Sequence, residues 1–299
     1  MTPSENDPIK TSTLSKTSEA FSPSHLTGFF QIFENGSTGA GANTVDGART
    51  RVTLHAEAAK PARISVNGAV AEAPVSRKVI ELFGDLAQST SLTIEHSILS
   101  PIGYGLGMSG AGAFSLTLAL NDVLGEPLSY HECMELAVRA EIASGTGLGD
   151  VVAQQFHGVM IGLPPYPSRA VENIPTDGEQ VVCAFFGPLE TKKIIRDSTW
   201  RDKINQVGAE CMADLLRNRT LPNLMSLCRR FTLETGLASP ELRNVLAAVP
   251  TASMAMLGQT AFILTKDVET AKKQLSQFTD RIQVSALSET GAAVVRSAS

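Results

Sequence analysis

The sequence predicts an α+β protein built from two layered halves. Strand-like and helix-like segments are interleaved without strict alternation, which favours sheets covered by helices over a doubly wound parallel sheet. The chain has 299 residues, 43% hydrophobic and 18% charged, enough to bury the cores of one large or two moderate domains. We expect a disordered tail over 1–24, rich in Ser, Thr, Pro and charge. A first domain over 25–167 and a second over 168–299 should meet at a proline-rich turn.

Apolar and alternating runs predict the strands of the first half, and helical spacing predicts its helices. The expected strands are 25–33, 49–56, 63–66, 91–98 and 158–163, and the expected helices are 78–86, 109–124, 129–143 and a short one that begins at Asp150. Ser129 should cap the third of these helices, with Glu132 completing a capping box. The run 35–43 (NGSTGAGAN) is expected to be a glycine-rich loop.

The second half should open on a buried strand at 180–186 (QVVCAFF). Its other expected strands are 259–265 and 281–286, and its expected helices are 200–217, 223–235, 240–248 and 268–278.

Composition excludes several classes of function. The net charge is −5 and no basic stripe appears, which argues against nucleic-acid and membrane-surface partners. No apolar run approaches the ~18–20 residues of a membrane span, and no signal-peptide pattern is present. Four scattered cysteines without CxxC spacing indicate reduced thiols, and five histidines show no metal-ligand spacing. We therefore expect a cytoplasmic location.

A glycine-rich segment over 101–112 (PIGYGLGMSGAG) is the strongest functional signal. Glycines bring the backbone close to a ligand, and the helix that follows offers free N–H groups, so the pair predicts a phosphate cradle. Gly105, Gly107 and Gly110 also form a GxGxxG. A dinucleotide-binding fold is excluded because a second helix follows where a strand should stand, and the absence of GK[ST] excludes a Walker A loop.

Three further features suggest chemistry at this loop. Ser109 could coordinate Mg²⁺ or a phosphate oxygen; alternatively, GMSGA is a loose GxSxG elbow, with Asp150 and His157 as triad partners. Glu141 and Asp150 could supply one metal carboxylate and one base for phosphoryl transfer to an alcohol. Gly258, in SMAMLGQT, would allow close backbone approach to a ligand.

These segments, in this order, resemble the GHMP kinase superfamily. PIGYGLGMSGA is similar to its phosphate loop PxGxGLGSS(A/G)A, with Met108 in place of the first serine. Glu141 and Asp150 stand where the superfamily places its magnesium carboxylate and catalytic aspartate, and SMAMLGQT resembles its third motif. TGFFQIF, TGLGDVVAQ, GPLETKKI and AMLGQTAF resemble the archaeal pantoate kinase family in particular.

The resemblance implies a GHMP kinase-like fold, with an N-terminal domain like ribosomal protein S5 domain 2 and a ferredoxin-like C-terminal domain. It implies ATP-dependent phosphorylation of the primary hydroxyl of pantoate to 4-phosphopantoate in coenzyme A biosynthesis, with ATP and Mg²⁺ as cofactors and a possible homodimer. Asp150 would be catalytic, and Ser109 and Glu141 would hold the metal. Thr27, Thr191 and Gly258 would contact the substrate. The implied phosphate-binding residues are Gly103, Gly105, Leu106, Gly107, Met108, Ser109, Gly110 and Ala111.

Two positions depart from the family pattern. A histidine is expected three residues before the metal glutamate, where this chain has Val138, and an arginine is expected near Gly162. Arg139 or Arg169 are candidate replacements. A GHMP kinase for another hydroxy acid or alcohol, of mevalonate or homoserine type, and a non-catalytic nucleotide-binding homologue therefore remain as alternatives.

Overall fold

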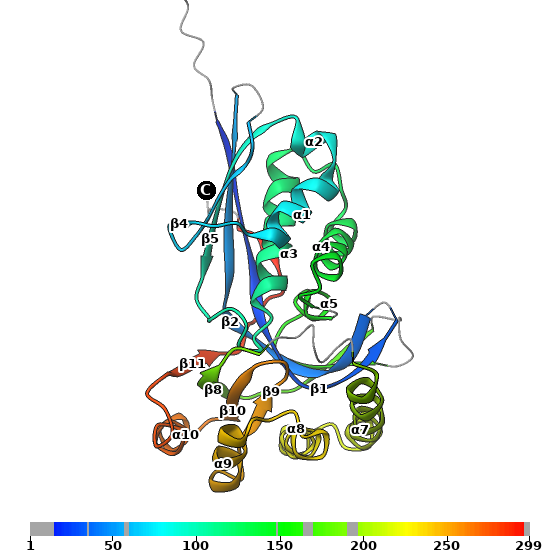
Figure 1. Cartoon of the computed structure of the whole chain (residues 1–299), viewed down its shortest axis with the longest axis vertical. Helices are drawn as coiled ribbons and strands as arrows, with labels where there is room; N and C mark the ends of the chain where they lie inside the picture. The colour runs from blue at the N-terminus through cyan, green and yellow to red at the C-terminus, as the bar shows by residue number, and fades with distance from the viewer. Residues whose placement is uncertain are drawn as a thin grey trace, which may run out of the picture.

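The computed structural model describes residues 15–34, 36–56, 60–147, 149–163, 170–189 and 197–295. Two β-sheets, each covered by helices on one side, meet at the level of the glycine-rich segment (Figure 1). This arrangement confirms the expected α+β class. Within the described parts of the chain, no helix has the length and apolar character needed to cross a bilayer.

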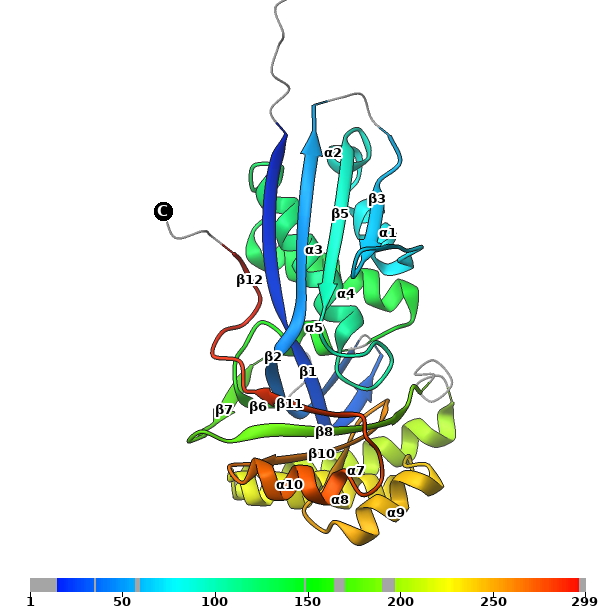
Figure 2. The ribbon, with the colours of Figure 1, turned by 90° about the vertical axis from the view of Figure 1, so that its left-hand side faces the viewer.

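The first sheet is eight-stranded and mostly antiparallel, in the order β12-β1-β2-β5-β3-β4, with β6 paired to β2 and β7 paired to β6. Its strands are β1 (Lys16–Phe33), β2 (Gly36–His55), β3 (Arg63–Val66), β4 (Ala69–Val70), β5 (Ser91–Ile98), β6 (Val159–Gly162), β7 (Val171–Ile174) and β12 (Ala293–Val294). Its helices are α1 (Pro74–Phe83), α2 (Asp85–Gln88), α3 (Met108–Val123), α4 (Tyr130–Ser144) and α5 (Asp150–Ala153). Helices α1 to α5 cover one face of this sheet, and none of the described helices covers the other face of its upper part (Figures 1 and 2).

The second sheet is antiparallel, in the order β11-β8-β10-β9, and it lies below the first (Figure 2). Its strands are β8 (Gln180–Gly187), β9 (Ser253–Ala255), β10 (Gln259–Thr265) and β11 (Ile282–Ala286). Its helices are α7 (Ser198–Arg217), α8 (Leu221–Thr235), α9 (Pro240–Ala248) and α10 (Val268–Leu275). The lower parts of β1 and β2 pack on α7 and α8, so one hydrophobic core joins the two halves.

Two long strands replace features that the sequence suggested were irregular. The expected tail over 1–24 is wrong from Lys16 onward, because β1 begins there and every second residue from Ser18 to Ser24 is buried. Composition suggested disorder, but small polar side chains at period two let β1 pack closely against α3. The expected loop over 35–43 is also wrong from Gly36 onward, because that segment opens β2.

The glycines of β2 explain why that segment is a strand. A Cβ at Gly39 would lie 2.1 Å from the carbonyl oxygen of Phe29, and one at Gly41 would lie 2.2 Å from that of Leu26. The glycines therefore serve close approach of β1 to β2 within the sheet rather than a turn.

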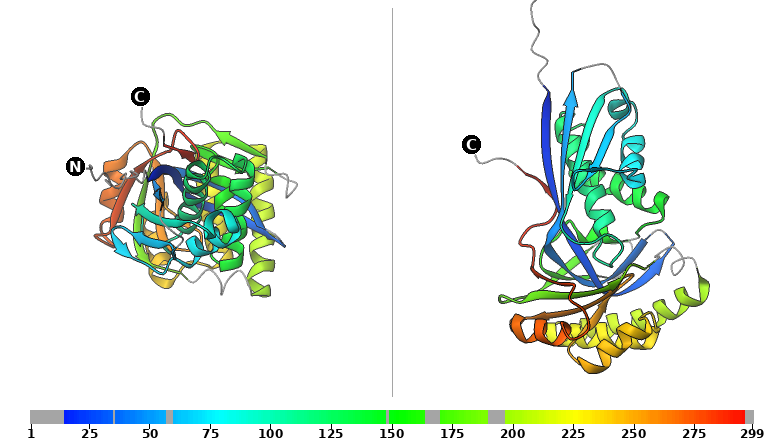
Figure 3. Two further views of the ribbon diagram at one scale, coloured as in Figure 1. Left: turned by 90° about the horizontal axis from the view of Figure 1, so that it is seen from above. Right: turned by 60° about the vertical axis from the view of Figure 1, so that its left-hand side comes forward.

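The expected domain limits also change. β7 follows the proline-rich turn but pairs with β6 in the first sheet, and β12 returns to pair with β1 from the far end of the chain. Figure 3 shows this C-terminal segment running up the edge of the first sheet. The chain therefore crosses between the halves more than once, because strand pairing depends on contacts that are distant in sequence.

The helix that carries Glu141 begins as expected. Ser129 caps α4, accepting a hydrogen bond from the Glu132 backbone N–H, and the Glu132 carboxylate accepts one from the Ser129 N–H at 2.8 Å. Gly145, at φ 67°, ends the helix. These caps fix the last turn of α4 beside the N-terminus of α3, where the site is built.

Candidate active site

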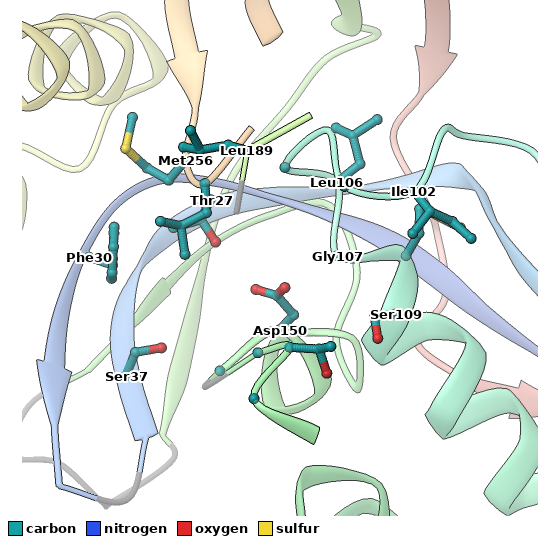
Figure 4. A pocket seen from close by; sticks show the side chains of 18 residues that line it. Thr27, Phe30, Ser37, Ile102, Leu106, Gly107, Ser109, Asp150, Leu189 and Met256 are labelled. Carbon is teal, nitrogen blue, oxygen red and sulfur yellow. The ribbon is translucent and has the colours of Figure 1, made fainter. Parts of the chain in front are cut away.

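Two cavities meet at Asp150. The first, here called the loop cavity, has a volume of about 380 Å³ and is lined by residues 102–103, 105–109, 145–147 and 149, and by Thr27, Phe30 and Met256. The second, here called the strand cavity, has a volume of about 70 Å³ and is lined mainly by β1, β2, α5 and β6. In Figure 4 the Asp150 carboxylate points into the loop cavity between Thr27 on β1 and Ser109 on α3.

Backbone conformation explains the glycines of the loop. Gly103, Gly105 and Gly107 have φ angles of 85°, 82° and 60°, the left-handed region that other residues rarely enter. Gly107 is also the N-cap of α3. Its position is fixed by Gln154, whose Nε2 donates to the Gly107 carbonyl oxygen at 2.9 Å. The loop thus delivers the N-terminus of a 16-residue helix to the cavity.

Six of the eight expected phosphate-binding residues line the loop cavity: Gly103, Gly105, Leu106, Gly107, Met108 and Ser109. Gly110 and Ala111 do not line it. Ala111 is a correction, because its N–H already donates to the Gly107 carbonyl at 2.9 Å as the first bond of the helix. Gly110 instead makes room for Gln154, whose Oε1 would lie 3.1 Å from a Cβ at that position.

The expected metal-binding pair is brought into direct contact. Ser109 Oγ donates to Glu141 Oε1 at 2.6 Å, joining the first turn of α3 to the last turn of α4. Thr146 Oγ1 donates to the same carboxylate oxygen at 2.8 Å. A Cβ at Gly147 would lie 2.6 Å from Glu141 Oε2, so this glycine lets the turn close over the carboxylate.

Burial dominates the electrostatics of Glu141. The side chain is 3% exposed, and desolvation raises its pKa to about 7, against the lowering effect of the Ser109 and Thr146 hydrogen bonds. The charge of Asp150 adds to the rise. A carboxylate held this way is poised to gain from a nearby cation.

Asp150 occupies the first position of α5. Burial raises its pKa to about 6, and a Cβ at Gly107 would lie 3.2 Å from its Oδ2, so the carboxylate lies directly under the phosphate loop. The short helix is fixed from below, because Asn43 Nδ2 donates to the carbonyls of Ala153 and Phe156 at 2.9 Å each.

The glycine of the third motif supports the loop rather than lining the cavity itself. A Cβ at Gly258 would lie 1.9 Å from the carbonyl carbon of Tyr104, and Thr260 Oγ1 donates to the Tyr104 oxygen at 2.7 Å. Gly258 is therefore a packing partner of the loop, and its neighbours Met256 and Leu257 line the cavity.

Two of the expected substrate-binding residues and the serine-hydrolase alternative remain to be placed. Thr27 lines both cavities, and Thr191 lies outside the described residues. The structure does not support the serine-hydrolase alternative, because the Ser109 hydroxyl donates its hydrogen bond to Glu141 and the proposed triad histidine, His157, is exposed.

The two positions at which the chain differs from the family pattern lie in the wall of the strand cavity. Val138 and Gly162 both line it. Arg139, a candidate replacement, is exposed and lines neither cavity, and Arg169 is among the residues that are not described.

The oxygen donors fit a magnesium ion shared with phosphates. Mg²⁺ in phosphoryl-transfer sites takes one or two protein oxygens and completes its shell with phosphate oxygens and waters. The Ser109 hydroxyl and the Glu141 carboxylate are such a pair. Among the described residues no group of three or more His, Cys, Asp or Glu forms an all-protein metal cage, which agrees with this mode.

Sequence reasoning did not single out Thr146, Gln154 and His25. Thr146 stands in the second glycine turn, SGTGLG, and Gln154, four residues after Asp150, is the C-cap of the same short helix. Their short distance in sequence from Glu141 and Asp150 could have marked them as part of the site. His25 had none, because only strand pairing brings it to the site.

Comparison with known proteins agrees with this geometry. The family described as GHMP kinases N terminal domain matches residues 71–158. The pantoate kinase of Methanocaldococcus jannaschii is 34% identical over 266 residues, covering 86% of this chain and 95% of that protein. The pantoate kinase of Methanospirillum hungatei is 31% identical, with coverage of 86% and 91%.

A solved structure extends the agreement to three dimensions. A protein described as a phosphotransferase related to the CoA biosynthesis pathway superposes with a TM-score of 0.84 at 26% identity, over 94% of this chain and 99% of that one. Fold, motif positions and sequence identity all point the same way: the chain belongs to the pantoate kinase family of GHMP kinases.

Proposed function

We propose that the chain transfers the γ-phosphoryl group of ATP to the primary hydroxyl of pantoate, giving 4-phosphopantoate for coenzyme A biosynthesis. One observation carries the proposal: Asp150 stands between a glycine-walled cavity at a helix N-terminus and a smaller, largely apolar cavity. The relatives named pantoate kinase, at 34% and 31% identity, support this choice of acceptor.

The loop would hold the phosphates of ATP. The first N–H groups of a helix have no partner within the helix, and the helix dipole favours an anion there. The N-terminus of α3 opens onto the loop cavity through Met108 and Ser109, so backbone groups supply most of the recognition.

Ser109 and Glu141 would hold Mg²⁺ beside those phosphates. When bound, the ion neutralises charge on the phosphate oxygens. Ser109 must then release its hydrogen bond to Glu141, and the Thr146 hydroxyl still holds the carboxylate in place.

Asp150 would orient the acceptor hydroxyl and take its proton. In the balanced step, the hydroxyl oxygen attacks the γ-phosphorus, the bond from that phosphorus to the bridging oxygen breaks, and ADP leaves. The proton passes from the hydroxyl to Asp150. Partial burial raises the pKa of Asp150 to about 6, which makes it a better proton acceptor than an ordinary carboxylate while it stays ionised at neutral pH.

A second candidate is a GHMP kinase for a different alcohol. Among the described residues, no Lys or Arg lines either cavity, so none of their side chains supplies a positive charge to bind the carboxylate of a substrate. Mevalonate and homoserine carry a carboxylate as pantoate does, so this observation does not separate the three acids, and it keeps uncharged alcohols in the comparison.

The test is a coupled ADP-release assay with Mg-ATP and a panel of acceptors: pantoate, mevalonate, homoserine, and the alcohol in which an amide replaces the carboxylate of pantoate. We expect pantoate to give the highest kcat/KM, with 4-phosphopantoate identified by ³¹P NMR. Turnover of another acceptor without pantoate would overturn the substrate, and no turnover of any acceptor would favour a non-catalytic nucleotide-binding protein.

A further inference from the structure

A buried histidine in the wall of the strand cavity has no role in the phosphoryl-transfer chemistry described above. His25 lies on β1, directly across from Asn43 on β2, and is 6% exposed. Its Nδ1 lies 2.8 Å from Asn43 Oδ1. It shares the lining of the strand cavity with Asp150, which places it on the acceptor side of the site.

The proton on this imidazole can be assigned from its neighbour. Asn43 Nδ2 donates to two backbone carbonyls, of Ala153 and Phe156, so the amide oxygen must face His25 as an acceptor. His25 Nδ1 therefore carries the hydrogen and donates it. Burial lowers the pKa of His25 to about 4, so the ring is neutral and its Nε2 bears only a lone pair.

That lone pair is unused within the protein. Among the residues that the structure describes, Nε2 has no hydrogen-bond partner. The protein does not enclose this atom completely. It is therefore reachable from the strand cavity. A fixed, neutral acceptor in such a site calls for a donor on the ligand, since a buried polar group left unpaired costs free energy.

The surroundings limit what the donor can be. The cavity wall near Asp150 is largely apolar, with Val138, Val152 and Met160 among its side chains. A branched hydrocarbon fits such a wall. A neutral hydroxyl fits the nitrogen better than an ammonium, because Asp150 is the one carboxylate among the described residues that line the cavity, and none of them could balance a second charge.

We propose that His25 Nε2 accepts a hydrogen bond from a second hydroxyl of the acceptor, one that is not phosphorylated. His25 is thus a specificity-determining residue that selects a 1,3-diol over a simple alcohol. This assignment rests on the proposed function, and in pantoate the hydroxyl is the one on C2.

The experiment compares two acceptors that differ in that hydroxyl alone: pantoate and 4-hydroxy-3,3-dimethylbutanoate. For the wild type we expect kcat/KM to favour pantoate by on the order of 10²-fold, because a site built to bind a hydroxyl rejects the analogue that lacks it. His25→Asn keeps a donor near Nδ1 for Asn43 but removes the acceptor, so the preference should fall to within about threefold.

Two further variants separate recognition from folding. His25→Gln can place an amide oxygen near the Nε2 position while losing the bond to Asn43, so it should keep most of the preference and lose thermal stability. His96→Gln is the matched control. His96 is also buried, but both of its ring nitrogens are bonded, to Thr50 and Ser76, and it lies away from the cavities, so the preference should be unchanged.

The outcomes are distinct. A preference that survives in His25→Asn would show that His25 is only structural and would overturn the inference. A wild type that phosphorylates both acceptors equally would overturn it as well. A wild type that phosphorylates neither but acts on a mevalonate- or homoserine-type alcohol would instead refute pantoate as the substrate, and the hydroxyl assignment with it.

Discussion

The two cavities on either side of Asp150 are built in opposite ways. The loop cavity is walled mainly by two short glycine-rich segments, and Thr27, Phe30 and Met256 complete it. The strand cavity is walled by side chains of β1, β2, β6 and α5, which come from separate parts of the chain. If the proposed function holds, the nucleotide is recognised mainly through a local motif and the acceptor through side chains that the tertiary structure brings together.

The largest effect is expected from a substitution of Asp150, the carboxylate that lines both cavities. Asp150→Asn removes the proton acceptor and keeps the shape of the side chain, so kcat should fall by about 10³-fold. Because the phosphate loop is untouched, ATP binding measured by calorimetry should stay within about twofold. Asp85→Asn, at the N-terminus of α2 and away from both cavities, is the control. A comparable loss of ATP affinity in Asp150→Asn would show that the cavities do not work separately.

The next effect concerns Glu141, which bonds to Ser109 in the wall of the loop cavity. Glu141→Gln removes the carboxylate that would hold Mg²⁺, so kcat/KM for Mg-ATP should fall by at least ~10²-fold. The free protein should become more stable. Burial raises the pKa of Glu141 from 4.5 to about 7, so the folded state prefers the protonated acid.

The sign of this stability change depends on pH. Below pH 4.5 the glutamate is protonated in both states, and the wild type and the variant should unfold at similar temperatures. Between pH 4.5 and about 7 the wild type loses stability relative to Glu141→Gln, and above that range the difference of roughly 1–3 kcal/mol is constant. Thermal unfolding of the apo protein from pH 4 to 8 measures this, with Glu135→Gln on the same helix as control. A variant less stable at pH 8 would refute the argument.

A smaller effect tests how the third motif supports the loop. In Gly258→Ala the new Cβ would meet the Tyr104 carbonyl carbon at 1.9 Å, which must displace the loop. We expect kcat/KM for ATP to fall by about 10–100-fold while the KM for the acceptor changes little. Gly187→Ala is the matched control, because nothing lies within 4 Å of its Cβ position. An equal rise in both KM values would show that the motif serves both cavities.

The smallest effect sharpens the role of the second glycine turn. Thr146→Val removes one of the two hydroxyls that donate to Glu141 Oε1, so the apparent Mg²⁺ affinity in the kinase assay should fall by about tenfold. Thr146→Ser should restore most of it. An unchanged magnesium dependence in the valine variant would mean that Ser109 alone positions the carboxylate.

Much of the fold could be predicted, and the errors have a common physical cause. Local sequence patterns predict α4, with its capping box of Ser129 and Glu132, and they predict the strand β10. The structure confirms both elements. The start of β1 and the glycines of β2 were assigned to a tail and a loop. Small residues have weak local preferences, and their conformation here is set by the partner strand and by α3.

The sequence alone determined the phosphate loop, because positive φ angles at three positions and an apolar helix behind them need particular residues at fixed spacing. Only the tertiary structure decided which carboxylate bonds to Ser109, that Gly258 packs against Tyr104, and that His25 lines the strand cavity. These contacts join residues from about 30 to more than 150 positions apart, and no local pattern encodes them. The glycine-rich loop could therefore be inferred from residues near one another in the chain, whereas the walls of the strand cavity form only once the strands have paired.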